Sequence, residues 1–130
     1  MKRIDHVGVV VEDLSAARRF LDEVLGFTFD RSLSVPGRLE AAFYKCGDAS
    51  VELIEVTDPA EREQRLGNAT ARIEHIAVQV EDLNRAFDQL LAAGVQATTA
   101  APVVGGPLRS YFTRPETSNG VIFQIFDRAD

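Results

Sequence analysis

The sequence lacks tryptophan, and among its 130 residues it has one cysteine, one methionine and two histidines. The single cysteine, Cys46, excludes a disulfide within the chain, which fits the reducing cytoplasm. No run of apolar residues approaches the length of about 20 residues that a membrane-spanning helix needs. We therefore expect a cytoplasmic protein that has no membrane partner.

Positive charge is also scarce, because 14 lysine and arginine residues stand against 20 aspartate and glutamate residues, giving a net charge of −6. Nucleic-acid-binding proteins usually gather basic residues on one surface, whereas here they are scattered along the sequence. We expect no nucleic acid partner. A local basic pocket for an anionic small molecule is still compatible with this composition.

Although the chain is short, it contains nearly the same phrase twice. The stretch IDHVGVVVEDLSAA begins at Ile4, and the stretch IEHIAVQVEDLNRA begins 69 positions later at Ile73. A histidine stands third in each copy, so that His6 aligns with His75. Two copies with so long a period indicate a duplicated half-domain rather than a stacked solenoid.

Each copy begins with an alternating apolar run that is typical of a strand, over residues 3–11 and 72–80. Asp13 and Asp82 follow, and a short carboxylate there can accept the free amides of a helix's first turn. Apolar residues then recur at helical spacing. A glycine that favours helix termination stands just beyond each helix, at Gly26 and Gly94.

Three further strand-like runs follow each helix and are separated by turn signals. They cover residues 27–35, 39–46 and 51–56 in the first half, and 95–100, 108–114 and 121–126 in the second, with a loop expected over 101–107. Each half thus reads strand-helix-strand-strand-strand, and the expected fold class is α+β. We expect module one over 1–57, a polar linker with one short helix over 58–71, and module two over 72–130.

This order, together with an early histidine in each copy, resembles the vicinal oxygen chelate superfamily of glyoxalases, bleomycin resistance proteins and dioxygenases. The motifs IDHVGVVVEDL, LDEVLGF, VELIEV, IEHIAVQVEDL and FTRPETSNGVIFQIF look most like those of methylmalonyl-CoA epimerases. The resemblance covers nearly the whole chain. It implies tandem βαβββ modules that form a cupped mixed sheet around one metal site.

In this superfamily the metal ligands lie on the first and last strands of each module, and the resemblance places them at His6, Glu52, His75 and Gln124. Glu52 and Gln124 also stand at matching places in two otherwise apolar runs, where a polar side chain without a partner is unfavourable. Imidazole nitrogens with carboxylate and amide oxygens suit Zn, Ni, Co, Mn or Fe(II). The resemblance therefore implies a divalent metal ion as the cofactor.

The sequence departs from the epimerases and glyoxalases that it resembles at Gln124, where those families have a glutamate that is both ligand and base. An amide cannot accept the proton, whereas Glu52 stands where the family has glutamine or glutamate. We hypothesise that Glu52 is the catalytic base and that Glu40 is the candidate for a second acid or base. A surface glutamate on a half-exposed strand is an equally good interpretation of Glu40.

Three residues near the end of the chain are candidates for substrate binding. Arg109 and Arg114 could pair with an anionic group such as a CoA phosphate, or lie solvated at strand ends. Tyr111, like its neighbour Phe112, could line the cup or belong to the core. The resemblance implies a small-molecule substrate, either an acyl-CoA or another oxygen chelator, and a homodimer, because an open sheet has edges that pairing protects.

Four functions are compatible with these residues. The first is a metal-dependent epimerase or isomerase like methylmalonyl-CoA epimerase, and the second is a glyoxalase-I-type lactoylglutathione lyase with the same ligands. The third is a non-haem Fe(II) dioxygenase, in which two histidines and Glu52 would form a facial triad. The fourth is a small-molecule binding or resistance protein without turnover, because Gln124 replaces the usual base.

Overall fold

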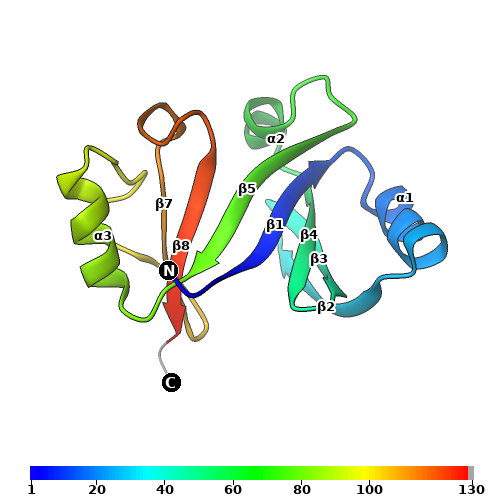
Figure 1. Cartoon of the computed structure of the whole chain (residues 1–130). Helices are drawn as coiled ribbons and strands as arrows, with labels where there is room; N and C mark the ends of the chain where they lie inside the picture. Colours follow the sequence, from blue (N-terminus) through cyan, green and yellow to red (C-terminus); the bar gives the residue numbers. More distant parts are fainter. Residues whose placement is uncertain (129–130) are drawn as a thin grey trace. The chain divides into compact units, whose positions relative to one another are not determined.

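The structure, a computed structural model, describes residues 1–128 of the chain (Figure 1). These residues form two compact units. The N-terminal unit comprises His6–Glu74, and the C-terminal unit comprises Met1–Asp5 together with the residues from His75 onward. Strand β1 (Arg3–Val11) and strand β5 (Ala71–Gln79) each contribute residues to both units.

In the N-terminal unit, one helix and three strands follow β1. They are helix α1 (Leu14–Arg19) with its π-helical continuation η1 (Phe20–Leu25), β2 (Thr28–Val35), β3 (Leu39–Cys46) and β4 (Ala49–Val56), and a short helix α2 (Pro59–Arg65) comes next. The strand order is β2-β3-β4-β1. Strand β4 pairs antiparallel with β3 and parallel with β1, so this part of the sheet is mixed.

The C-terminal unit repeats this plan. After β5 come helix α3 (Leu83–Ala92), β6 (Val103–Gly105), β7 (Leu108–Phe112), a 3-10 turn η2 (Pro115–Thr117) and β8 (Ile122–Arg128). The strand order is β5-β8-β7-β6, with β8 parallel to β5 and antiparallel to β7. The predicted α+β class, with a mixed sheet and a strand-helix-strand-strand-strand order in each half, is confirmed.

The predicted helix boundaries are also confirmed. Asp13 and Asp82 adopt extended backbone before α1 and α3, and each carboxylate accepts a hydrogen bond of 3.1 Å from the amide three residues later. Gly26 and Gly94 follow the two helices with φ angles of 71° and 92°, which glycine adopts without steric strain. The expected short helix in the linker is α2, and Asp58 caps it.

The second strand of the C-terminal unit does not lie where it was expected. Residues 95–100 contribute one isolated bridge, Ala97 to Thr113, while β6 falls within 101–107, where a loop was expected. Val103 and Val104 are β-branched and suit a strand, and Gly106 turns the chain into β7 with a φ of 58°. The turn itself is therefore only Gly106-Pro107, and not the whole segment 101–107.

Helices α1 and α3 each pack against one face of the strands in their own unit (Figure 1). The N-terminal cluster includes Leu14, Ala17, Leu21, Val9, Val11 and Leu53, and the C-terminal cluster includes Leu83, Ala86, Leu90, Val78, Val80 and Ile125. Burying a side chain of leucine or valine size contributes about 1.5–3 kcal/mol. These helix contacts hold the strands in place, and the opposite strand faces carry the candidate site.

Among the described residues, none of the helices combines the length and the apolar character that crossing a membrane would require.

Candidate metal centre

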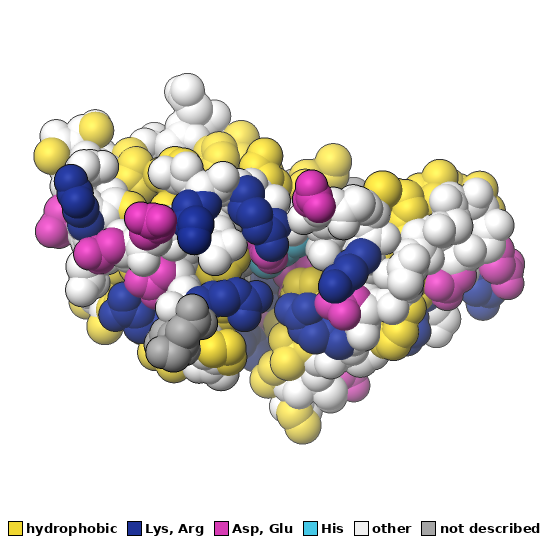
Figure 2. All heavy atoms as spheres, turned by 60° about the horizontal axis from the view of Figure 1, so that its bottom comes forward, with side chains coloured by type: hydrophobic (Ala, Val, Ile, Leu, Met, Phe, Trp, Pro, Cys, Tyr) yellow, Lys and Arg dark blue, Asp and Glu magenta, His cyan; other side chains and the backbone are white. Residues whose placement is uncertain are grey.

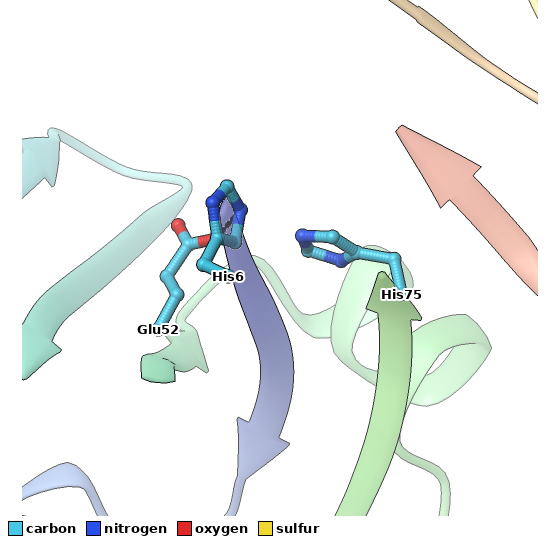
Figure 3. Close-up of side chains that lie close together, drawn as sticks. All are labelled: His6, Glu52 and His75. Carbon is cyan, nitrogen blue, oxygen red and sulfur yellow. Dashed lines mark ion pairs between the residues drawn. The ribbon is translucent and has the colours of Figure 1, made fainter. Parts of the chain in front are cut away.

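His6 and Glu52 form a half-site within the N-terminal unit. Gly8 pairs with Glu52 across the parallel strands β1 and β4, and alternation along β1 places His6 on the same face as Gly8. The imidazole Nε2 of His6 lies 3.3 Å from the Glu52 carboxylate Oε1 (Figure 3). Both residues are buried, with exposed fractions of 5% and 9%.

His75 and Gln124 occupy the matching places in the C-terminal unit. Ala77 pairs with Gln124 across β5 and β8, as Gly8 does with Glu52, so His75 and Gln124 share one face of their strands. His75 is buried, with an exposed fraction of 4%. The side-chain Nε2 of Gln124 donates a hydrogen bond of 3.0 Å to the hydroxyl of Ser110.

A phenylalanine edge supports each imidazole ring. The rings of His6 and Phe43 are 5.6 Å apart at 85°, and the rings of His75 and Phe112 are 5.9 Å apart at 82°. Phe43 and Phe112 pair with Glu52 and Gln124 on the adjacent strands. The two half-sites are therefore equivalent in register and in packing, and their main chemical difference is carboxylate against carboxamide.

The donor atoms fit a divalent cation. His6, Glu52 and His75 each offer one atom of a kind that ligates metals, and the side-chain carbonyl of Gln124 is a further oxygen donor. A small residue stands next to each histidine on the same face of its strand, opposite the polar residue of the neighbouring strand. It is Gly8, opposite Glu52, in the N-terminal unit and Ala77, opposite Gln124, in the C-terminal unit. Small residues leave space beside the imidazole and carboxyl groups, which a bulky side chain would fill.

The structure does not bring Glu40 to this half-site. Glu40 pairs with Glu55, whereas Phe43 pairs with Glu52. Because side chains alternate along a strand, Glu40 lies on the face of β3 opposite to Phe43 and is exposed to solvent. The second acid or base expected from Glu40 is therefore not on the face that carries His6 and Glu52.

Arg109 and Tyr111 also lie on the helix-facing side, away from Gln124. The Arg109 guanidinium makes two hydrogen bonds, of 3.0 and 2.7 Å, to Asp127, whose carboxylate also accepts the Leu83 amide at the start of α3. Arg109, together with the Leu83 amide, holds the pKa of the Asp127 carboxyl below its ordinary value. Tyr111 stacks at 4.4 Å on Phe87 of α3. These contacts stabilise the unit.

Arg114, the third residue expected to bind substrate, lies just beyond β7. Its guanidinium Nε donates to the carbonyl of Ala97 at 3.3 Å, and its Nη1 lies 3.9 Å from Glu116. It is exposed, so it remains accessible to an anionic ligand.

The interpretation of the sequence missed Arg31, Phe43 and Ser110. The Arg31 guanidinium lies 3.9 Å above the Phe43 ring, and Arg31 pairs with Phe43 on the strand face that carries Glu52. The 69-residue offset that relates the two histidines also relates Phe43 to Phe112, so the repeat contained a signal for both rings. No comparable signal marks Arg31, because its face depends on strand register.

Basic and acidic side chains are interspersed on the surface that Figure 2 displays, without a broad patch of positive charge. This distribution agrees with the scattered basic residues of the sequence.

Two βαβββ units, each with a histidine and a polar residue on neighbouring parallel strands, define a glyoxalase-like protein. Residues 3–125 match the model of the Glyoxalase/Bleomycin resistance protein/Dioxygenase superfamily. The chain belongs to this superfamily.

Relatives within the superfamily include proteins with and without an assigned activity. The chain is 29% identical to the uncharacterized Bacillus subtilis protein YqjC over 128 residues, which cover 96% of this chain and 91% of that protein. It is 22% identical to human mitochondrial methylmalonyl-CoA epimerase over 130 residues, covering 95% of this chain and 72% of the epimerase. The crystal structure of methylmalonyl-CoA epimerase from Mycobacterium tuberculosis superposes with a TM-score of 0.87 at 23% identity, covering 98% of this chain and 88% of that one. The resemblance to methylmalonyl-CoA epimerases extends over the whole fold.

Proposed function

We propose that His6, Glu52, His75 and Gln124 bind one divalent metal ion, and that the protein moves a proton on the carbon next to a carbonyl of its substrate. The observation that carries this proposal is the equivalence of the two half-sites, in which Gly8 pairs with Glu52 as Ala77 pairs with Gln124. A duplicated scaffold that presents a histidine and an oxygen donor from each copy suits one shared ion. The candidate ions are Zn, Ni, Co, Mn and Fe(II).

A bound ion of this kind supplies Lewis acidity that stabilises negative charge on a substrate carbonyl oxygen. Glu52 is the group of this set that can accept a proton, because the Gln124 amide has no basic lone pair at neutral pH. The hydrogen bond from Gln124 Nε2 to Ser110 directs the other end of the amide, its carbonyl oxygen, away from that hydroxyl. Gln124 thus has the role of a neutral ligand and Glu52 that of a base.

The proposed reaction is an epimerisation or isomerisation like that of methylmalonyl-CoA epimerase. Human methylmalonyl-CoA epimerase is a distant relative, and a neighbouring epimerase structure contains methylmalonyl-CoA. An acyl-CoA thioester whose neighbouring carbon carries an acidic proton is accordingly the proposed substrate class. Glu52 would remove that proton, and the group that returns a proton on the other side of the carbon is not Glu40, which lies on the opposite face of β3.

The proposal is tested first by metal analysis and then by isotope exchange. The purified protein, offered each candidate ion and freed of excess, should retain about one ion per chain. Incubation with methylmalonyl-CoA in D₂O should then introduce deuterium next to the thioester. Glu52→Gln should lower the exchange rate by about 10²-fold or more while the ion stays bound.

Glu40→Gln is the matched control, because it makes the same chemical change on the opposite strand face and should leave the exchange rate unaltered. Full exchange by Glu52→Gln would reject Glu52 as the base. A chain that neither holds nor acquires a metal ion would reject the proposal as a whole.

A second candidate is a non-haem Fe(II) dioxygenase. Two histidines and one carboxylate, here His6, His75 and Glu52, are the donor types of the facial triad in such enzymes. Oxygen uptake by the Fe(II)-loaded protein in the presence of catechols distinguishes a dioxygenase from an epimerase or isomerase. Uptake without deuterium exchange into methylmalonyl-CoA would favour the dioxygenase.

A further inference from the structure

A cavity of about 620 Å³ lies within the C-terminal unit, on the helix-facing side of its strands and so on the face opposite to His75 and Gln124. Its volume is within the range of about 300–1,000 Å³ that is common for small-molecule pockets. Six wall residues come from β5, α3, β8 and the segments beside them. They are Val78, Leu90, Val95, Thr113, Phe123 and Ile125.

Each of these wall residues has a counterpart in the N-terminal unit. The counterparts, in the same order, are Val9, Leu21, Phe27, Tyr44, Val51 and Leu53, and all six pack together in one core cluster. The cavity therefore occupies the place in the C-terminal unit that corresponds to closed core in the N-terminal unit.

Backbone pairing supports this correspondence. Phe27 donates its amide to the carbonyl of Leu21 at 2.9 Å, just after the first helix, and Val95 donates to Leu90 at 3.0 Å after the second. Tyr44 pairs with Val51 between β3 and β4. The amide of Thr113 likewise donates to the carbonyl of Phe123 at 2.9 Å.

The cavity is present because two aromatic rings are absent from its walls. Phe27 and Tyr44 fill the N-terminal core, and Tyr44 is completely buried, with its hydroxyl bonded to Arg18 and Asp22 at 3.0 Å each. Val95 and Thr113 stand at their places in the C-terminal unit and lack these rings. The larger Phe123, in place of Val51, compensates for only part of the lost volume.

We propose that this cavity binds a small, uncharged monocyclic aromatic molecule, which takes the place that the rings of Phe27 and Tyr44 occupy in the other unit. The polar atom of the deep wall, Thr113 Oγ1, already accepts the Phe123 amide and shares a hydrogen bond of 2.7 Å with Ser118. None of the residues that line the cavity has a charged side chain, so a charged ligand would find no side chain of opposite sign there. The rim includes Thr117, Ser118 and Asn119, which can accommodate a polar substituent on the ring.

Toluene is a suitable probe, because it is a single ring without a charge. We expect titration of the full chain with toluene to shift the methyl resonances of Val78, Leu90 and Val95 in a saturable manner. Val95→Phe introduces the residue of the N-terminal unit into the wall and should weaken toluene binding by about tenfold or more, because the new ring fills the space. Val104→Phe is the matched control, since Val104 is 69% exposed on β6, and it should bind toluene like the parent protein.

Two results would overturn the proposal. One is the absence of saturable shifts in the parent protein up to the solubility of toluene. The other is unchanged toluene affinity in a folded Val95→Phe variant. If Val95→Phe does not fold, Thr113→Tyr supplies the same comparison, and the map of shifted methyl groups in the parent protein locates the ligand without any variant. Addition of a metal chelator should leave toluene binding unchanged, so the outcome is independent of the metal centre.

Discussion

Replacing Asp127 with alanine should destabilise the protein markedly, because this one carboxylate makes two kinds of contact. It is 6% exposed and accepts the Leu83 amide at 2.9 Å, at the first residue of α3. It also accepts two hydrogen bonds from Arg109. The substitution removes the strand-to-helix link on which the position of α3 depends.

The expected loss follows from the helix contact. Leu83 is fully buried, and leaving its amide without a partner costs about 1–3 kcal/mol. The pair with Arg109 adds little, because 36% of that side chain is exposed and solvent screens it. We expect a total of about 1–3 kcal/mol, or a fall in melting temperature of about 4–11 °C.

This loss should depend on pH in a defined direction. Arg109 lowers the pKa of Asp127 in the folded protein, so the carboxylate stabilises the fold fully above the unfolded pKa of about 3.9. That contribution disappears as the pH falls through the lowered folded pKa. The difference in melting temperature between parent and Asp127→Ala should therefore be constant above about pH 5 and shrink below it.

Glu55→Ala is the matched control in the N-terminal unit. Glu55 accepts the Leu14 amide at 2.8 Å, as Asp127 accepts that of Leu83, but its partner on the neighbouring strand is Glu40, where Asp127 has Arg109. Removing Glu55 also relieves a repulsion between like charges, so its loss should be the smaller one. Equal melting temperatures for Asp127→Ala and the parent, or a difference that persists at low pH, would refute the reasoning.

Three further outcomes are expected. His75→Ala should lower the bound metal from about one ion per chain to a small fraction of that, by elemental analysis, because one of the proposed ligands is lost. Ser110→Ala should weaken metal binding by about tenfold in a competition titration, because the Gln124 amide loses the hydroxyl that orients it. Tyr44→Phe should reduce the free energy of unfolding by about 1–2 kcal/mol in urea, because Asp22 and Arg18 lose their partner, while metal binding stays unchanged.

The repeat in the sequence made much of the fold predictable. A single histidine on an apolar strand says little, but His6 and His75 at a constant offset indicate equivalent places in two units. The same offset relates the caps Asp13 and Asp82, and the structure confirms both. Local signals that occur twice are more reliable than either copy alone, because chance rarely repeats the whole pattern.

The faces of the later strands could not be predicted in the same way. A shift of one residue in register moves a side chain to the other face of a sheet, and the sequence gives no absolute register for β3 or β7. Glu40, Arg109 and Tyr111 were candidates for the site, with a solvated or core position as the alternative, and all three lie on the helix-facing side. Glu40 and Arg109 are themselves separated by 69 residues, so the repeat related them correctly without showing which face they occupy.

The π-helical segment η1 was also beyond prediction. The apolar residues from Leu14 to Val24 fit a helix of ordinary pitch, and a π-turn adds one residue without altering which side chains are apolar. The extra residue shows in the backbone hydrogen bond that follows each helix. The Phe27 amide donates to the carbonyl of Leu21, six residues earlier, whereas the Val95 amide donates to the carbonyl of Leu90, five residues earlier.

The two units satisfy the same folding requirements, so the positions at which they differ are the best indicators of function. Glu52 and Gln124 are such a pair, because the strand register and the phenylalanine beside each histidine match between the half-sites. If the half-sites are equivalent, exchanging the two residues should move the base from one unit to the other without removing it. The double variant Glu52→Gln with Gln124→Glu should therefore bind one metal ion and exchange deuterium within about tenfold of the parent rate, whereas Glu52→Gln alone should not. Loss of exchange in a double variant that still binds metal would show that the surroundings of Glu52, and not its carboxylate alone, make it the base.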